Sequence, residues 1–466
     1  MVTEKMYDKL AELVVKKGVN VQKDQPVIIN SSVQNVSFVR KVARYAYEAG
    51  ARYVQVEWRD TDLTKMSYQY GTKEVLSEVP QWMYDKTKYQ HDGGACYISI
   101  TSDKPGSMAD VDSEKMNIAN MAYYTKMADL MSYTMNNEGQ WCVFGIPSKE
   151  WAKVVFPDLS EEEAFDKLEE AIFSVTRVTE DNDPIAEWTK HDQEMTEHAD
   201  KLNTYNFEKL HFVSELGTDL YVGLVDEHIW VGGGCETPKG VFFDPNMPTE
   251  ECFCMPLKNG TNGIVYASKP LNYHGKLIEK FWLRFEDGKV VDYDAEKGKD
   301  ILAKLLSFDE GSSYLGEVAL VPYDSPVSRS GILFFNTLYD ENAACHLALG
   351  RPYPENLKGG TEMSKEELAG HGANDSMQHE DFMFGTREMS VDASVKTEPL
   401  FRFSEMEILF FKCFRRKSWR SKRLGLMIQM NSWNCGWLIL RRITEVLTLI
   451  WPGKSERLCR TITAQS

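Results

Sequence analysis

The first 150 residues of this 466-residue chain alternate between two hydrophobic patterns, and this alternation restricts the fold more than any other feature. Residues 7–17 and 38–49 carry apolar side chains at the spacing of an amphipathic helix. Short apolar runs typical of strands cover residues 26–29, 53–58, 95–100 and 141–146. Helices that alternate with strands predict a parallel sheet with helices on both faces. We therefore expect a doubly wound α/β domain at the amino terminus.

The pattern changes near residue 208. Just before it, Asp183 and Pro184 predict the start of a helix that continues toward residue 205. Beyond it, strand-like runs separated by glycine-containing turns cover residues 210–213, 219–222, 263–266 and 281–285, and residues 285–291 predict a hairpin. We therefore predict an α/β plus α+β protein, with an amino-terminal α/β domain over residues 1–207 and a β-rich catalytic domain over residues 208–400.

Potential metal ligands lie in this second part, each within a segment otherwise suited to tight packing: Glu251, Glu317, His346, His379 and Asp381. Three carboxylates and two imidazoles suit divalent ions such as Zn, Co, Mn or Mg. A structural zinc site usually takes four Cys or His ligands, which makes this set unsuitable for one. Two ions about 3.5–4 Å apart, bridged by a carboxylate, would use all five residues and activate a water for hydrolysis.

Each of these residues also has a purely structural interpretation, because a lone Glu is usually solvated and a lone His usually a satisfied structural group. The segments around Glu317 and His346 are apolar, however, and a buried carboxylate there must be paired or bound to a metal. Asp340 and Glu341 precede His346 closely enough to hold its imidazole without being ligands. Zinc capture by thiols of Cys252 and Cys254 also remains open.

In order and spacing, the segments around these residues resemble the aminopeptidase T family of metallo-aminopeptidases, which includes PepS-like bacterial enzymes. The similarity is carried by residues 246–253, 311–322, 336–350 and 379–383, and it covers about residues 1–400. It implies that Glu251, Glu317, His346, His379 and Asp381 bind two divalent ions. It also implies a homodimer that acts on peptides with a free amino terminus.

The same resemblance assigns two catalytic roles. Glu317 would be the carboxylate nearest the nucleophilic water, and Tyr353 would donate a hydrogen bond to the oxyanion of the tetrahedral intermediate. Considered without the family, the run Arg-Pro-Tyr-Pro favours a rigid loop in which Tyr353 is a packed ring.

The ligand types alone indicate only metal-assisted hydrolysis, so two other functions stay open. A dinuclear amidase or phosphoesterase is one, and a phosphoesterase would favour several basic side chains near the ligands, where Arg329 and Arg351 are the nearest. A catalytically inactive binding protein is the other, although all five ligands are present. The sequence lacks His-Glu-x-x-His, phosphate-loop and Gly-x-Ser-x-Gly motifs. Three glycines at residues 232–234 predict a turn near the substrate pocket.

The net charge of the chain and the sequence of its amino terminus indicate which binding partners and which cellular compartment to expect. A net charge of −17 and a pI near 5.1 argue against nucleic-acid binding. Residues 1–7 have neither the basic start nor the apolar core of a signal peptide, and nine cysteines occur without regular spacing. We therefore expect a cytoplasmic protein with no membrane partner.

The carboxy-terminal residues differ from the rest. Residues 401–466 contain 13 Lys and Arg against 4 Asp and Glu, a balance of +9, whereas residues 1–400 carry −26. A shifted reading frame, an appended basic module and a membrane-surface anchor would each produce such a reversal. The apolar stretch at residues 436–450 is interrupted by Arg441, Arg442 and Glu445 and is too short to span a bilayer. We expect an atypical basic tail, frameshifted or disordered.

Overall fold

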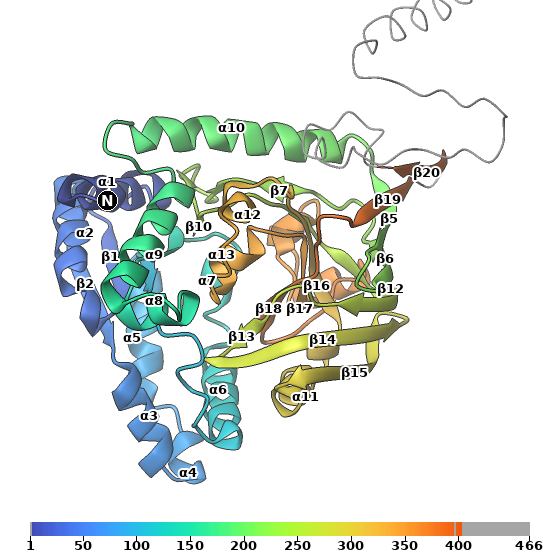
Figure 1. The fold of residues 1–466 in the computed structure, drawn as a ribbon, viewed down its shortest axis with the longest axis horizontal. Coiled ribbons are helices and arrows are strands. Elements are labelled where there is room, and N and C mark those ends of the chain that lie inside the picture. Colours follow the sequence, from blue (N-terminus) through green and yellow to red (C-terminus); the bar gives the residue numbers. More distant parts are fainter. Residues whose placement is uncertain (1, 396–397, 403–466) are drawn as a thin grey trace, which may run out of the picture. The chain divides into compact units, whose positions relative to one another are not determined.

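The computed structural model describes residues 2–395 and 398–402 (Figure 1). The prediction about the basic tail therefore falls outside the described residues, except for residues 401 and 402. Within the described ranges, no helix is both long enough and apolar enough to cross a membrane.

Helices alternate with strands in the first half of the chain and strands dominate the second half, as the two hydrophobic patterns predict, and several further elements were not predicted. The α-helices are α1 (Glu4–Leu13), α2 (Val36–Glu48), α3 (Thr61–Tyr70), α4 (Lys73–Leu76), α5 (Gln81–Asp92), α6 (Ser113–Met127), α7 (Ser132–Met135), α8 (Lys149–Val155), α9 (Glu161–Val175), α10 (Pro184–Asn203), α11 (Lys299–Leu306), α12 (Pro326–Ser330), α13 (Thr337–Glu341) and α14 (Lys365–Gly370). The strands of the first half are β1 (Pro26–Ser32), β2 (Tyr53–Arg59), β3 (Cys96–Thr101), β4 (Trp141–Gly145), β5 (Phe207–Val213), β6 (Asp219–Leu224), β7 (Val231–Gly232), β8 (Cys235–Glu236), β9 (Phe242–Phe243) and β10 (Asn246–Met247). Those of the second half are β11 (Cys252–Cys254), β12 (Pro256–Tyr266), β13 (Leu271–Tyr273), β14 (Lys276–Glu286), β15 (Lys289–Lys297), β16 (Leu315–Leu320), β17 (His346–Gly350), β18 (His379–Met383), β19 (Ser390–Val395) and β20 (Glu398–Arg402).

The amino-terminal sheet is parallel, as predicted, and has the strand order β10-β4-β3-β1-β2. Side chains alternate between its faces. On β4, Cys142 and Phe144 belong to a buried cluster with α1 and α2, whereas Val143 between them packs against a second cluster from α8, α9 and α13. Helices thus cover both faces, which confirms the doubly wound layout.

One strand of this sheet comes from far along the chain. The two residues of β10, Asn246 and Met247, pair in parallel with Val143 and Phe144 of β4. The backbone amide of Val143 also donates to the carbonyl of Pro245 at 2.7 Å. The segment just before Glu251 is therefore anchored to the amino-terminal sheet.

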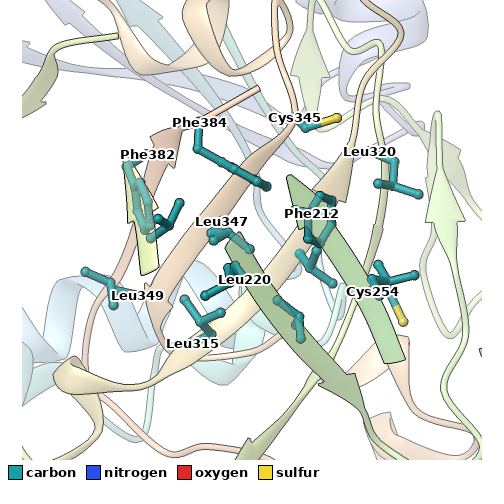
Figure 2. Close-up of a cluster of buried hydrophobic side chains, with 14 of the residues drawn as sticks. Phe212, Leu220, Cys254, Leu315, Leu320, Cys345, Leu347, Leu349, Phe382 and Phe384 are labelled. Atoms are coloured by element: carbon teal, nitrogen blue, oxygen red, sulfur yellow. The ribbon is translucent and has the colours of Figure 1, made fainter. Parts of the chain in front are cut away.

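The β-rich part consists mainly of two sheets. An eight-stranded sheet has the order β13-β14-β12-β6-β5-β19-β20 with β15 beside β14, and a five-stranded sheet has the order β18-β17-β16-β11-β7. The predicted hairpin is confirmed as the β14–β15 pair. Phe212 and Leu220 of the larger sheet share one buried core with Leu347 and Leu349 of the smaller one (Figure 2). This core fixes one face of the five-stranded sheet and leaves the opposite face for the candidate site.

Candidate metal centre

The predicted ligands lie on neighbouring strands of the five-stranded sheet. Glu317 is on β16, His346 begins β17, and His379 and Asp381 lie two residues apart on β18. The register places Glu317 opposite Ala348, and Ala348 opposite Asp381. Directly opposed residues share a face, as do residues two apart along a strand. All four side chains therefore project from the same face.

A β-bulge at Gly316 makes this arrangement possible. The register changes between the pair Leu315–Leu349 and the pair Glu317–Ala348. Leu315 consequently faces the hydrophobic core while Glu317, two residues later, faces the site. A Cβ atom at Gly316 would lie 2.5 Å from the carbonyl oxygen of Gly350, so the close strand approach at the bulge requires glycine.

Glu251 reaches the site from the residue just before β11. Its position is set by the preceding residues: the amide of Glu250 donates to Oδ1 of buried Asn342 at 2.6 Å, and Asn342 Nδ2 donates to the carbonyl of Pro248 at 3.2 Å. The Glu250 carboxylate accepts a hydrogen bond from Arg177 at 2.6 Å. Asn342 and Arg177 thus hold the residues that directly precede Glu251.

Short distances connect all five predicted ligands. His346 Nε2 lies 2.7 Å from Glu251 Oε2 and 3.4 Å from Glu317 Oε1. His379 Nε2 lies 3.6 Å from Glu317 Oε2 and 3.5 Å from Asp381 Oδ1. Two groups result, Glu251 with Glu317 and His346, and Glu317 with His379 and Asp381, and in each the candidate ligand atoms lie within 4.8 Å of one another. Glu317 belongs to both groups.

Backbone carbonyls set the orientation of both imidazoles. His346 Nδ1 lies 3.1 Å from the carbonyl oxygen of Glu341 and 3.2 Å from that of Ala344, and His379 Nδ1 lies 2.6 Å from that of Arg351. With a proton on Nδ1 donated to a carbonyl, Nε2 of each ring faces the carboxylates, as a metal-binding imidazole requires.

Of the two acidic residues predicted to hold His346, only Glu341 does so, and it acts through its backbone. The expectation for Asp340 is wrong, because its carboxylate accepts hydrogen bonds from the amides of Phe334 and Asn336 at 3.0 and 3.1 Å. It therefore closes the loop before α13. The side chain of Glu341 instead lines the cavity.

The acidic side chains of this site carry more negative charge than the cations of the protein neutralise, so some of them hold protons. Burial raises the pKa of Glu317 to about 7, and burial together with Asp381 raises the pKa of Glu341 well above its usual value. Burial alone would lower the pKa of His379, but Asp381 and Glu317 outweigh it and raise the pKa to about 10. Protons thus occupy positions that a divalent cation would take over.

Unsatisfied oxygens test whether the site fits a metal. Glu251 Oε2 and Asp381 Oδ1 are buried, and each faces an imidazole nitrogen, at 2.7 and 3.5 Å, in place of any amide or hydroxyl donor. Buried carboxylate oxygens of this kind need a cation. The oxygen and nitrogen donors suit Zn, Co, Mn or Mg. Cys252 and Cys254 belong to the hydrophobic core instead, and neither joins the two groups found among the described residues.

A cavity of about 50 Å³ opens onto the five predicted ligands. Its other lining residues are Trp141, Gly233, Cys235, Pro245, Asn246, Thr249, Phe253, Glu341, Tyr353 and Glu355. Tyr353, the predicted oxyanion donor, packs edge-on against His379 with ring centroids 4.9 Å apart and against Phe253 at 5.7 Å. Gly233, one of the three glycines predicted to form a turn near the substrate pocket, forms a bend between β7 and β8 and lines this cavity. No Arg or Lys lines this cavity, and neither Arg329 nor Arg351 is among its walls.

Glu355, which lines the cavity, and its hydrogen-bond partner Asn137 went unrecognised in the sequence. Glu355 follows Tyr353 by two residues, and Asn137, whose amide donates to Glu355 Oε2 at 2.8 Å, is more than 200 residues away. Trp141 connects to the same pair, since its Nε1 donates to Asn137 Oδ1 at 3.4 Å. In the sequence, the position of Glu355 two residues after Tyr353 is the one signal that could have pointed to Glu355, and no local signal points to Asn137.

The chain is similar to known metalloproteases and aminopeptidases over most of its length. The family model described as thermophilic metalloprotease (M29) matches residues 3–404. The chain is 46% identical to aminopeptidase AmpS of Bacillus subtilis over 84% of this chain and 96% of the relative, and 39% identical to aminopeptidase T of Thermus aquaticus over 83% and 93%. The structure of wild-type AmpT from Thermus thermophilus superposes with a TM-score of 0.78 at 37% identity, covering 86% of this chain and 98% of that one.

The fold and the carboxylate–imidazole cluster are those of a metallopeptidase. The chain belongs to the M29 family of thermophilic metalloproteases. The predicted fold class and the predicted family are therefore confirmed, and with them the prediction of a metal-dependent aminopeptidase.

Proposed function

We propose that this metallo-aminopeptidase removes amino-terminal residues from peptides with two divalent ions held by Glu251, Glu317, His346, His379 and Asp381. The observation that carries the proposal is the sharing of Glu317 between two ligand groups, one on each side of it. A carboxylate in that position is what a pair of ions about 3.5–4 Å apart requires as a bridge. When bound, two such ions would supply a water of lowered pKa and Lewis acidity toward a carbonyl oxygen.

The residues of the chain then have separate tasks. Glu317 lies between both groups, so its carboxylate takes a proton from the attacking water and passes it to the leaving amine. Tyr353 donates a hydrogen bond to the oxyanion that forms from the scissile carbonyl. The packed rings of Phe253 and His379 hold the phenol at the cavity wall.

The cavity also favours the end of a peptide over its middle. A volume of about 50 Å³ has room for a few waters or for the backbone atoms of one terminal residue. Phosphate esters fit it poorly, because no basic side chain lines it. An inactive binding protein is disfavoured as well, since all five ligands lie together.

We also propose a homodimer and a cytoplasmic location. Large apolar side chains are exposed on the consecutive helices α3 to α5: Leu63, Tyr70, Val75, Trp82 and Tyr89. Exposed apolar side chains in such number favour a protein interface. Six cysteines in the described part of the chain are buried and free, which fits a reducing compartment. A charge introduced by Trp82→Glu should shift the mass in solution from dimer to monomer, as measured by sedimentation; an unchanged mass would exclude this surface.

Metal content and peptidase activity test the main proposal together. Protein stripped with a chelator and reloaded with Zn, Co, Mn or Mg should bind two ions per chain and release the amine from aminoacyl anilides. Glu317→Gln should lose the activity, and Glu310→Gln, an exposed change in the same region, should keep it. Full activity with a single ion per chain would refute the two-ion site, and metal-loaded protein without any aminopeptidase activity would refute the function.

A further inference from the structure

Glu355 is a carboxylate in the cavity that the proposed mechanism does not use. It lies in a short 3-10 turn, Pro354–Asn356, directly after Tyr353. Its side chain is partly buried and lines the same cavity as the five ligands. Among the described residues its partners are the neutral amide of Asn137 at 2.8 Å and the thiol of Cys235 at 3.9 Å. The carboxylate is thus held in place by neutral donors.

No cation of the described protein neutralises Glu355. The Lys, Arg and His side chains that pair with acids in the described ranges pair with other carboxylates. Burial raises the pKa of Glu355 to about 7, and the nearby Glu317 adds to this increase. A carboxylate in such a place is completed by a positive charge that arrives from outside.

Substrate geometry brings such a charge to this cavity. The α-amine nitrogen of a terminal residue lies about 2.5 Å from its carbonyl carbon, because only Cα separates them. A scissile carbonyl between the ligands and Tyr353 therefore places the α-ammonium in the same small cavity. Of the other carboxylates there, Glu251, Glu317 and Asp381 belong to the candidate ion sites. Glu341 also lines the cavity, but it lies beside these acids, and burial together with Asp381 raises its pKa well above the usual value, which favours its neutral form. Glu355 is therefore the carboxylate outside the ion sites whose position neutral donors fix.

We propose, on the basis of the proposed aminopeptidase function, that Glu355 binds the α-ammonium group of the substrate and thereby selects peptides with a free amino terminus. Asn137 is a positioning residue for Glu355. Its Oδ1 accepts from Trp141 Nε1 at 3.4 Å while its Nδ2 donates to Glu355, so the amide has one orientation. A residue just before a strand of the amino-terminal sheet thus helps to define specificity in the β-rich part.

A pair of inhibitors isolates the α-ammonium contact. Leucine hydroxamate and 4-methylpentanoyl hydroxamate share the side chain and the metal-binding group, and only the first has an α-amine. The variants are Glu355→Gln, Glu355→Asp as the charge-preserving change, and exposed Glu362→Gln as the matched control. Calorimetry gives both dissociation constants for each metal-loaded protein, and metal content is measured alongside.

Glu355→Gln should raise the dissociation constant of leucine hydroxamate about 10- to 150-fold, which is the range for the loss of a hydrogen bond to a charged group. Its affinity for the des-amino compound and its metal content should stay within about threefold of wild type, and Glu362→Gln should match wild type for both. Glu355→Asp should retain a preference for the amine. An equal loss of affinity for both compounds, or a loss of bound metal, would overturn the role assigned to Glu355 and leave the proposed aminopeptidase function standing. A wild-type protein that cleaves no aminoacyl anilide would overturn the proposed function, and this inference with it.

Discussion

Replacing Tyr353 with phenylalanine should remove one hydrogen-bond donor and little else. The ring contacts with His379 at 4.9 Å and Phe253 at 5.7 Å involve no hydroxyl group, so the substituted ring would keep the same packing. The lost donor serves only the oxyanion of the tetrahedral intermediate, so kcat should fall about 100- to 1000-fold, or about 2.7–4 kcal/mol of barrier. KM should change little, because the substrate carbonyl carries no such charge.

Steady-state hydrolysis of an aminoacyl anilide by metal-loaded protein measures this effect. Phe253→Leu is the matched control, because it alters the ring packing around Tyr353 and leaves the hydroxyl in place. A kcat for Tyr353→Phe within about threefold of wild type, at unchanged metal content, would contradict the oxyanion role. A parallel loss of kcat in both variants would assign the effect to packing.

The remaining predictions concern the strands and the charges around the site. Ala348→Val should place two added methyl groups between Glu317 and Asp381 and cost about 1–3 kcal/mol of stability, with a drop in bound metal measured by elemental analysis. Arg177→Met should leave Glu250 buried and unpaired and cost about 3–5 kcal/mol in urea unfolding, and most of this should return in the double variant with Glu250→Gln. Burial and Arg177 hold the pKa of His191 at about 3, below its unfolded value. The neutral imidazole therefore adds stability above about pH 6.5, and this stability is lost as the pH falls. Between pH 7 and pH 5, the free energy of unfolding of the wild-type protein should drop about 2 kcal/mol more than that of His191→Gln. Because the pKa of His379 is raised to about 10, metal uptake at about pH 7.5 should release at least one proton, seen as a buffer-dependent heat in calorimetry.

Periodic patterns in the sequence predicted the main strands of the amino-terminal sheet and several strands of the eight-stranded sheet, because burial on one or both faces imposes a local spacing. β1 to β4 lie where the apolar runs indicate, and Pro184 is the first residue of α10, with the Asp183 side chain capping its amides at 3.0 and 3.3 Å. β10 was not predicted. Two residues are too few to show any alternation, and only the pairing with β4 identifies them as a strand.

The site was predicted by ligand type and family resemblance, and its further features depend on contacts that no local pattern encodes. Asp340 and Glu341 are adjacent acids, and only the loop geometry decides that the first closes a turn while the second faces the cavity. Glu355 and Asn137 meet across 218 positions of sequence. The register shift at Gly316 is hidden for a related reason: strict alternation would place Leu315 and Glu317 on the same face.

That register shift connects metal binding to the stability of the β-rich core. Leu315 packs into the core beside Leu349, and the bulge then turns Glu317 to the opposite face, where two ligand groups need it. Without the bulge, either the leucine would leave the core or a carboxylate would enter it, and each change costs several kcal/mol. The core therefore holds Glu317 in place without an ion, so hydrophobic packing sets the spacing of the candidate ligands, and an ion bound there would replace protons.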